Sequence, residues 1–470
     1  MKRTLFCLGA LVMSLATLSS CSFLEVEELG KSDTDTFFSE LLGLRTARIG
    51  LYNITYDFYD QYLCKYAEVA GDNLQSVVVG SGSEMYDEFN FESTPDSETS
   101  SAGYIWKRGY AIITNANTIL SYTGDLKTAY PNDVDEIRRI EAEAYFLRAL
   151  AHFDLVRCYA QPYGYTEDAS HLGIPIADHL LGTDELIARS SVKKVYEQIV
   201  KDLNTAHDIL GDAAPSDACY VSGMACNALL ARVYLYMQNY ALAEEYANKV
   251  IPLLTLTPKS VYAAMFTGEK IGEEAIFRLT GYYAGHSLKT FYNYESAVFV
   301  PTSDFEELFL PNDVRRTLLY APDQSLACMK YYDLSSSVPD DQFYHITVLR
   351  GSEMYLIRAE ARCRQNNLED AAADLQKIQA RALGLSESSI EISYNTADEL
   401  MELIKEERRK EFFAEGHRFF DLARWGDDIV RPDDTNSAMK RLEYPDYRYA
   451  LPITRVEMDA NSAMVQNEGY

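Results

Sequence analysis

Residues 229–251 read LLARVYLYMQNYALAEEYANKVI, and residues 357–378 read IRAEARCRQNNLEDAAADLQKI. Small and apolar residues recur at the same spacing in both segments, namely Ala231, Ala243, Ala247 and Val250 in the first and Ala359, Ala371, Leu375 and Ile378 in the second. A polar turn falls at the same place in each, at Gln238-Asn239 and at Asn366-Asn367. Small residues at matching points let two antiparallel helices pack closely. The segments therefore predict two similar helix pairs, with chance agreement between Ala-rich helices as the alternative.

The helical pattern extends over most of the chain. Within residues 135–159, apolar residues form two adjacent stripes, which predicts a helix buried on most sides. From Val192 they recur at helical spacing until Gly211, a typical helix stop. Together with the repeated pairs, this pattern predicts an all-α fold in which tetratricopeptide-like helix pairs form a scaffold.

Two regions interrupt the helices. Residues 71–105 contain the polar runs GSGSE and STPDSETSSAG, and residues from about 256 to 345 mix Gly, Pro and Asp with short apolar runs and paired aromatic residues. Loops on a rigid frame commonly carry binding sites. The sequence therefore predicts a loop-rich side of the scaffold that binds a ligand.

The N-terminus has the features of an export signal. Lys2 and Arg3 precede the apolar run Thr4–Leu18, which is too short to cross a bilayer, where about 20 residues are needed. The stretch from Leu18 to Cys21 resembles the lipobox of a bacterial lipoprotein signal, in which the cysteine receives the lipid. An ordinary signal with a chance cysteine is the alternative. We therefore expect residues 1–20 to be removed and Cys21 to anchor the protein.

Composition narrows the classes of partner. The formal net charge of −28 disfavours nucleic acid and anionic lipid surfaces, since both are bound through basic patches. Six cysteines remain after Cys7 and Cys21, without a CxxC motif or zinc spacing, and we expect buried free thiols. The 35 tyrosines, against 2 tryptophans, suit a surface that holds polar ligands by apolar ring faces, although most must serve packing.

Five segments carry a resemblance to a known family. They are WKRGYAIITNANTIL from Trp106, EAEAYFLRALAHFDLVRCYAQPYG from Glu141, RGSEMYLIRAEARCR from Arg350, EERRKEFFAEGHRFFDLARWG from Glu406 and the C-terminal LPITRVEMDANSAMVQNEGY. In this order, behind a lipobox, they resemble the SusD/RagB family of outer-membrane nutrient-binding lipoproteins. The likeness runs over nearly the whole chain.

The resemblance implies both a fold and a role. It implies an all-α domain with tetratricopeptide-like pairs and no cofactor, lipid-anchored in the outer membrane and facing the cell surface. Such a protein captures a glycan, or a peptide in RagB-like members, and delivers it to a SusC-like TonB-dependent barrel. The acids Glu25, Glu27 and Glu28 resemble the tract that directs such lipoproteins outward. Trp106 and Trp425 fall within framework segments, which leaves ligand stacking to Tyr and Phe.

The resemblance also organises the chain into parts. We expect the signal peptide over 1–20 and a single SusD-like domain over 21–470. Its expected parts are a helical scaffold at about 35–255 and 346–385, a loop-rich binding side at about 71–105 and 256–345, and a C-terminal framework at 386–470.

Catalysis has weak support in the sequence. His417 and Asp421 lie four residues apart, as a His-carboxylate pair on a helix would. A nucleophile motif such as GxSxG and a metal motif such as HExxH are both missing from the sequence. We therefore expect no enzyme, and read this segment as framework with Glu406 and Lys410 paired. A glycosidase built on two carboxylates and a helical scaffold that binds partner proteins are the distant alternatives.

The predicted ligand-binding residues come from composition and from the loops' expected side of the fold, not from a family motif. A sugar ring is held by flat aromatic faces and a few polar groups. The candidates are Asp72, Asn73 and Tyr86 from the first loop region and Tyr282, Tyr283, Phe291, Tyr292 and Tyr294 from the second. A purely structural role is the alternative for each.

Overall fold

The fold is built mainly from helices. The computed structural model describes residues 34–78, 80, 82–96, 101–212, 217–267, 274–280, 287–332 and 344–470. The helices are α2 (Thr34–Phe38), α3 (Leu41–Phe58), α4 (Cys64–Val69), α5 (Tyr86–Asn90), α6 (Ser101–Ala129), α7 (Val134–Tyr159), α8 (Val192–Leu210), α9 (Gly223–Tyr236), α10 (Tyr240–Val250), α11 (Ser287–Phe291), α12 (Ser303–Glu306), α13 (Gly351–Arg364), α14 (Leu368–Leu383), α15 (Ala397–Glu411), α16 (Arg418–Trp425) and α17 (Arg455–Ala460). The signal segment and Cys21 lie outside the described residues.

The strands form short antiparallel pairs. The pairs are β1 (Leu74–Ser76) with β5 (Phe299–Pro301), β2 (Leu172–Pro175) with β3 (Arg189–Ser191), β4 (Ala275–Thr280) with β6 (His345–Arg350), and β7 (Ile429–Val430) with β8 (Arg441–Leu442). With strands confined to these pairs in the described ranges, the all-α prediction is confirmed.

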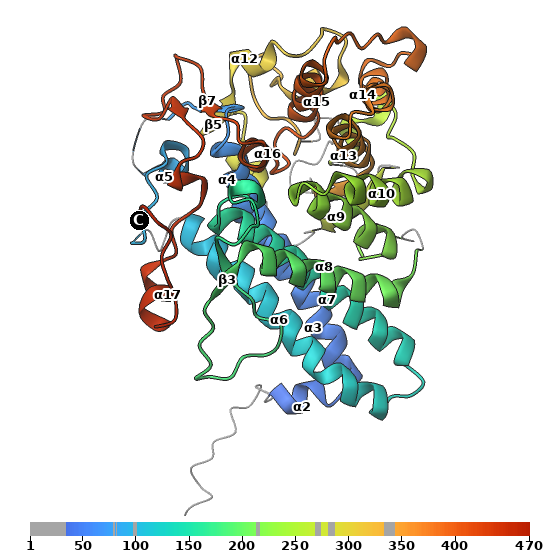
Figure 1. Cartoon of the computed structure of the whole chain (residues 1–470), viewed down its shortest axis with the longest axis vertical. Helices are drawn as coiled ribbons and strands as arrows, with labels where there is room; N and C mark the ends of the chain where they lie inside the picture. Colours follow the sequence, from blue (N-terminus) through green and yellow to red (C-terminus); the bar gives the residue numbers. More distant parts are fainter. Residues whose placement is uncertain are drawn as a thin grey trace, which may run out of the picture.

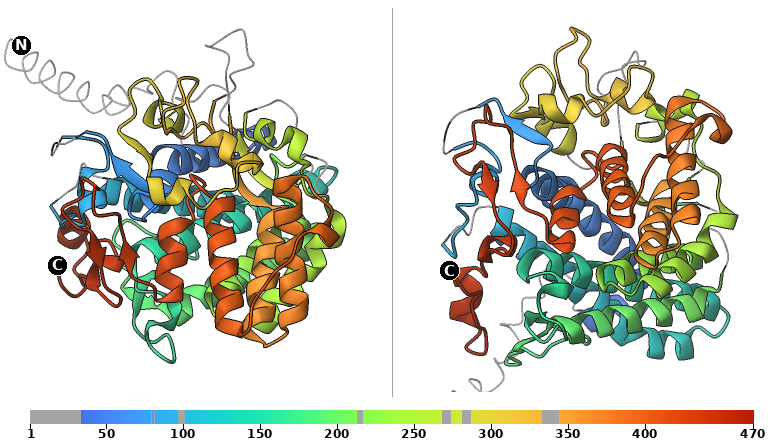
Figure 2. Two further views of the ribbon diagram at one scale, coloured as in Figure 1. Left: turned by 90° about the horizontal axis from the view of Figure 1, so that it is seen from above. Right: turned by 45° about the horizontal axis from the view of Figure 1, so that its top comes forward.

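The long helices stack in one continuous series (Figure 1). Each packs against the next in the order α3, α6, α7, α8, α9, α10, α13, α14, α15. Helices α10 and α13 are direct neighbours, although the whole segment 251–350 lies between them in the sequence. The described parts of that segment form the looped side above the stack, while α13, α14 and α15 stand side by side (Figure 2).

The two repeated segments form the predicted helix pairs, α9 with α10 and α13 with α14. The matched residues are all fully buried, namely Ala231, Ala243, Ala247, Val250, Ala359, Ala371, Leu375 and Ile378. The likeness extends to the backbone, since Gln238 and Asn366 at equivalent turn positions both adopt positive φ, 58° and 62°. The tetratricopeptide-like prediction is confirmed, and the two pairs are adjacent repeats split by an insertion.

Local sequence sets the helix ends. Ser191 opens α8 by accepting a hydrogen bond from the Lys194 amide at 3.4 Å, and Gly211 ends it with φ of 69°. Helix α10 begins in the same way, with Asn239 Oδ1 accepting from the Leu242 amide at 3.3 Å. These residues explain why the helices begin and end where the sequence predicts.

The six cysteines of the described part are free thiols. Five are buried, as predicted, whereas Cys219 is half-buried. Among the residues that the structure describes, no helix combines the length and the apolarity needed to cross a bilayer.

Candidate functional site

A cleft of about 550 Å³ opens between the segment that follows α7 and the C-terminal residues. This volume lies within the usual range for ligand pockets, roughly 300 to 1,000 Å³. The lining residues, which we call the C-terminal cleft, are Gln161, Tyr165, His171, Leu172, Pro445, Asp446, Tyr447, Ala450, Gln466, Asn467, Glu468 and Gly469. The two walls are far apart in the sequence and meet only in the folded chain.

Tyr447 stands on a tight turn that its neighbours hold in place. Asp446 accepts hydrogen bonds from the Arg448 backbone amide at 2.9 Å and from the Arg448 guanidinium at 2.8 and 2.9 Å. The Arg448 side chain lies 5.5 Å from the centre of the Tyr447 ring. The turn fixes the ring, which remains 41% exposed.

Residues 466–470, which we call the tail, contact the same ring. The Tyr470 ring packs edge-on against Tyr447 with centroids 4.9 Å apart, and its hydroxyl donates to the Ala450 carbonyl at 2.9 Å. Gly469 has φ of 97°, and a Cβ there would lie 2.4 Å from Tyr447 Cγ. A glycine is therefore required where the tail passes beneath the ring.

The tail is attached by side-chain amides. Gln466 exchanges hydrogen bonds with the backbone of Ile453 at 2.9 and 2.7 Å. Asn467 Nδ2 donates to the carbonyls of Tyr159 and Leu451 at 2.9 and 2.8 Å. These bonds make residues 466–469 a fixed wall of the cleft.

The opposite wall presents Tyr165, which is 45% exposed, against His171. His171 Nε2 lies 3.0 Å from the Gln161 carbonyl, so this nitrogen carries the proton, and Nδ1 accepts from the Thr166 hydroxyl at 2.8 Å. Burial lowers the pKa of His171. The imidazole is therefore neutral at pH 7 and fixed in one tautomer, and it supports Tyr165 edge-on.

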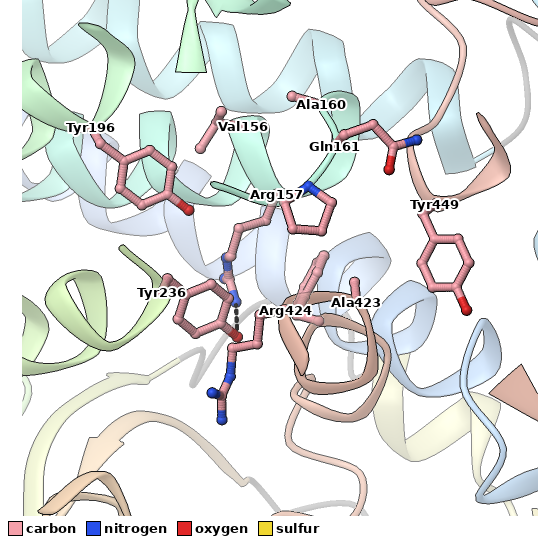
Figure 3. Close-up of a pocket in the computed structure, with 11 residues that line it drawn as sticks. Val156, Arg157, Ala160, Gln161, Tyr196, Tyr236, Ala423, Arg424 and Tyr449 are labelled. Atoms are coloured by element: carbon pink, nitrogen blue, oxygen red, sulfur yellow. Dashed lines mark hydrogen bonds between the residues drawn. The ribbon is translucent and has the colours of Figure 1, made fainter. Parts of the chain in front are cut away.

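A smaller pocket, whose lining is drawn in Figure 3, shares Gln161 with the cleft. Arg157 Nη1 donates to the Tyr236 hydroxyl there at 3.3 Å. The volume is about 20 Å³, which holds about one water molecule and no sugar ring. Its tyrosines and arginines therefore serve packing between the elements that line it.

A second cleft, of about 410 Å³, lies along α3. Its Tyr220 is 41% exposed, but one face is covered by the Arg48 guanidinium at 4.5 Å from the ring centre. Arg48 donates two hydrogen bonds to the Glu143 carboxylate, and Arg45 donates two to Glu136; we call this two-bond arrangement a fork. In this α3 cleft the rings of Tyr220 and Tyr52 pack edge-on against each other with centroids 5.8 Å apart, and both arginines already have partners.

His417 and Asp421 do not form the His-carboxylate pair that their spacing allows. Asp421 instead accepts from Arg408 Nε at 2.7 Å and from Arg424 Nε at 2.9 Å. Burial and the surrounding arginines, Arg232 foremost, lower the pKa of His417 well below its usual range. The geometry supports the framework interpretation, and the predicted pair of Glu406 and Lys410 is confirmed at 3.1 Å.

The framework contains a buried charge cluster. Its side chains are at most 6% exposed and comprise Arg315, Arg350, Arg381, Glu274, Glu407, Glu411 and Glu415. Glu411 accepts from Arg350 at 2.6 Å, from Arg315 at 3.0 Å and from Arg381. Against the effect of burial, Arg381, Arg350 and Arg315 hold the pKa of Glu411 well below its usual range. The cluster fastens the inserted segment to α14 and α15.

The two predicted loop regions do meet. Strand β1 pairs with β5, and the Thr302 amide donates to the Asn73 carbonyl at 3.0 Å. However, Asp72 is buried and accepts from Arg418 at 2.6 and 2.8 Å, and Asn73 is buried with Oδ1 bonded to Arg409 at 2.7 Å. The prediction that these two side chains contact a ligand is wrong, because both are used to join β1 to α15 and α16.

The aromatic candidates of the second loop region divide similarly. Phe291 and Tyr292 are buried in the core, 2% and 0% exposed, so neither ring offers a face and that prediction is wrong. Tyr294 is half-buried against Tyr332, with centroids 5.3 Å apart, and Tyr86 is half-buried at the start of α5. A binding role for these two stays a prediction. Tyr282 and Tyr283 lie outside the described residues.

Sequence reasoning missed the C-terminal cleft because its residues lie in segments read as framework. A signal was present in QPYGYTED (161–168) and EYPDYRY (443–449), two short loops in which two or more tyrosines lie close to a proline. The two tryptophans were placed correctly, since Trp106 Nε1 donates to Glu457 at 3.2 Å and Trp425 Nε1 donates to Glu360 at 2.9 Å.

The structure is thus a helical-repeat scaffold whose loops carry an aromatic cleft with a polar rim. Known proteins agree on the fold. A family model described as "SusD family" matches residues 321–470, and one described as "Starch-binding associating with outer membrane" matches residues 22–235. The two models match different parts of the chain, and together they confirm the resemblance to SusD-like proteins that the sequence predicts.

Individual relatives match over most of their length. The chain is 24% identical to "SusD-like protein P2" of Formosa agariphila, with 98% of each covered. A SusD superfamily protein of Bacteroides thetaiotaomicron superposes with a TM-score of 0.80 at 25% identity, over 90% of this chain and 98% of that one. A "putative sugar binding protein" of Bacteroides vulgatus gives 0.80 at 28% identity, over 92% and 98%.

Proposed function

We propose that this protein is a non-enzymatic, lipid-anchored binding protein that holds an oligosaccharide in the C-terminal cleft and delivers it to a SusC-like TonB-dependent outer-membrane barrel. The observation that carries the proposal is the pair of exposed tyrosines, Tyr165 and Tyr447, on two fixed walls of a cleft of about 550 Å³.

The chemistry of the cleft suits a sugar. A pyranose presents a face of CH groups and a rim of hydroxyls, so it needs flat rings beside hydrogen-bonding groups. The tyrosines supply the rings, while Asp446, Glu468 and the backbone of the tail supply acceptors at the rim. Because the supporting residues are already bonded to one another, little ordering is needed on binding.

Hydrolysis has no support in this cleft. A glycosidase needs one carboxyl group with a raised pKa to act as general acid. The hydrogen bond from Arg448 lowers the pKa of Asp446. Since that carboxylate stays ionised at neutral pH, we expect the bound glycan to be released intact.

Two comparisons support the choice of a glycan. One matching family model is described as starch-binding and associated with the outer membrane, and a relative of similar fold is described as a putative sugar binding protein. A RagB-like role in peptide binding is the second candidate, because tyrosine faces with a polar rim also suit extended peptides.

The binding test is calorimetric titration of a chain starting at Ser22 with neutral and acidic glycans and with mixed oligopeptides. Tyr447→Ala and Tyr165→Ala should each weaken binding of the selected glycan by about 1 to 3 kcal/mol, the scale of one lost ring stack. Tyr220→Ala in the α3 cleft is the matched control. Loss of affinity in Tyr86→Ala or Tyr294→Ala, with Tyr447→Ala unchanged, would place the site on the loop side instead.

The anchoring and delivery steps have separate tests. Twelve residues separate Cys21 from α2, which when extended reach roughly 40 Å. Cys21→Ala should release folded protein from the membrane, and retention of that variant would contradict the anchor. Co-purification of a TonB-dependent barrel with the wild-type protein is the expected result for delivery. Chromatography of the recovered glycan should show its original length.

A further inference from the structure

The lining of the C-terminal cleft is negatively charged. The described lining includes the carboxylates of Asp446 and Glu468, and neither Lys nor Arg is among those residues. Glu468 is exposed and, within the described ranges, forms no ion pair. An anionic group entering the cleft would therefore meet a carboxylate without a compensating partner.

The two arginines that donate to lining residues of the cleft, Arg448 and Arg189, are already bonded within the protein. Both Nε and Nη2 of Arg448 donate to the Asp446 carboxylate. Arg189, behind the tail, is buried and donates to the carbonyls of Gly173, Val465, Tyr159 and Leu172 and to Asn467 Oδ1. Drawing either guanidinium toward a ligand would break the bonds that shape the cleft.

The one histidine in the cleft supplies no charge either. His171 donates from Nε2 to the Gln161 carbonyl and accepts at Nδ1 from Thr166. A protonated imidazole would have to donate at Nδ1 as well, and the Thr166 hydroxyl would have to turn to accept. The hydrogen bonds therefore hold the neutral form.

From this arrangement we propose that the cleft selects uncharged oligosaccharides and rejects those bearing uronate or sulfate groups, a selectivity set by Glu468. This inference rests on the proposed function, because it assigns the class of glycan that the cleft takes. The chain's net charge of −28 acts in the same direction, but only over the Debye length of about 8 Å in physiological salt. Glu468 acts at contact distance, where screening is weakest.

The test uses one pair of probes. These are the neutral oligosaccharide selected by the glycan panel and the same oligosaccharide after oxidation of its C6 CH₂OH groups to carboxylates. The wild-type protein should bind the neutral form at least roughly tenfold more tightly, the scale of a like-charge contact near a surface. Glu468→Gln should narrow this ratio, and Glu468→Lys should abolish or reverse it.

A matched variant separates local charge from overall charge. Glu402→Lys makes the same charge change at an exposed position on α15 and should leave the ratio unchanged. Equal or tighter binding of the oxidised form by the wild-type protein would overturn the proposal. So would an equal change of the ratio in the two Lys variants, since net charge would then be the cause.

Failure of the function itself has a different signature. If the wild-type protein binds no glycan of the panel, the proposed function fails and the selectivity falls with it. If a glycan binds and the ratio is near one, the binding function stands and only the assigned class is wrong.

Discussion

The buried charge cluster and the C-terminal cleft use the same pair of groups, an arginine fork on a carboxylate, in opposite ways. Inside, Arg350 donates to Glu415 at 2.8 and 2.9 Å where neither side chain exceeds 5% exposure. At the cleft, Arg448 and Asp446 are each 23% exposed and hold a turn that carries Tyr447. The comparison teaches that losing one partner is costly where water is excluded, because a charge is left buried without its counter-ion. Where both partners are partly hydrated, the pair adds little stability and serves to position a neighbouring side chain.

The largest expected effect comes from breaking the buried cluster. Glu411→Ala leaves three buried guanidinium groups without their shared carboxylate, and we expect the free energy of unfolding to fall by about 3 to 5 kcal/mol. Urea denaturation measures it. The exposed Glu406→Ala on the same helix is the control and should cost less than about 1 kcal/mol. Similar losses in both variants would remove the distinction.

The next prediction concerns pH. Burial raises the pKa of Glu68 to about 7, although its carboxylate accepts from the Gly416 and His417 amides at 3.1 and 3.3 Å. The folded state then binds this proton more tightly than the unfolded state does, so the contribution to stability is present below pH 4.5 and is lost as pH rises to 7. From pH 8 to pH 5 the gain should be roughly 2 to 3 kcal/mol.

Glu68→Gln should remove that part of the pH dependence. Denaturation midpoints of the wild type and the variant at pH 5 and pH 8 measure the difference, and Glu402→Gln at an exposed site is the control. A variant as pH-dependent as the wild type would show that Glu68 titrates normally.

At the cleft, effects should appear in binding before they appear in stability. Gly469→Ala places a methyl group against the Tyr447 ring at a backbone angle that other residues rarely adopt, a strain of about 1 to 3 kcal/mol. We expect the tail to shift, affinity for the selected glycan to fall and the Tm to stay nearly constant. Gly182→Ala, in an open loop, is the matched control. Unchanged affinity would show that the tail does not shape the site.

The smallest effect on stability is expected for the exposed fork. Arg448→Ala should lower the free energy of unfolding by less than about 1 kcal/mol, because both partners are partly hydrated. It should nevertheless weaken glycan binding, since the turn beneath Tyr447 loses its clamp. Calorimetry beside thermal unfolding gives both values. A large loss of stability with full affinity would reverse the roles assigned to the two forks.

Much of the scaffold was predictable, because helical periodicity is local. The repeated alanines gave both helix pairs, and Ser191 and Gly211 marked the ends of α8. The site was less predictable. Asp72, Phe291 and Tyr292 lie in loop-like sequence, yet the structure buries all three, because β1 and β5 fold these loops onto α15 and α16.

The sequence by itself determined the helix pairs and the family resemblance, since both depend on residue type and short-range spacing. Only the tertiary structure decided which tyrosines keep an open face. Tyr165 and Tyr447 become a pair because the tail from Gln466 to Tyr470 is bonded between distant segments. Exposure of a side chain depends on what packs over it, and that information lies in contacts between parts of the chain hundreds of residues apart.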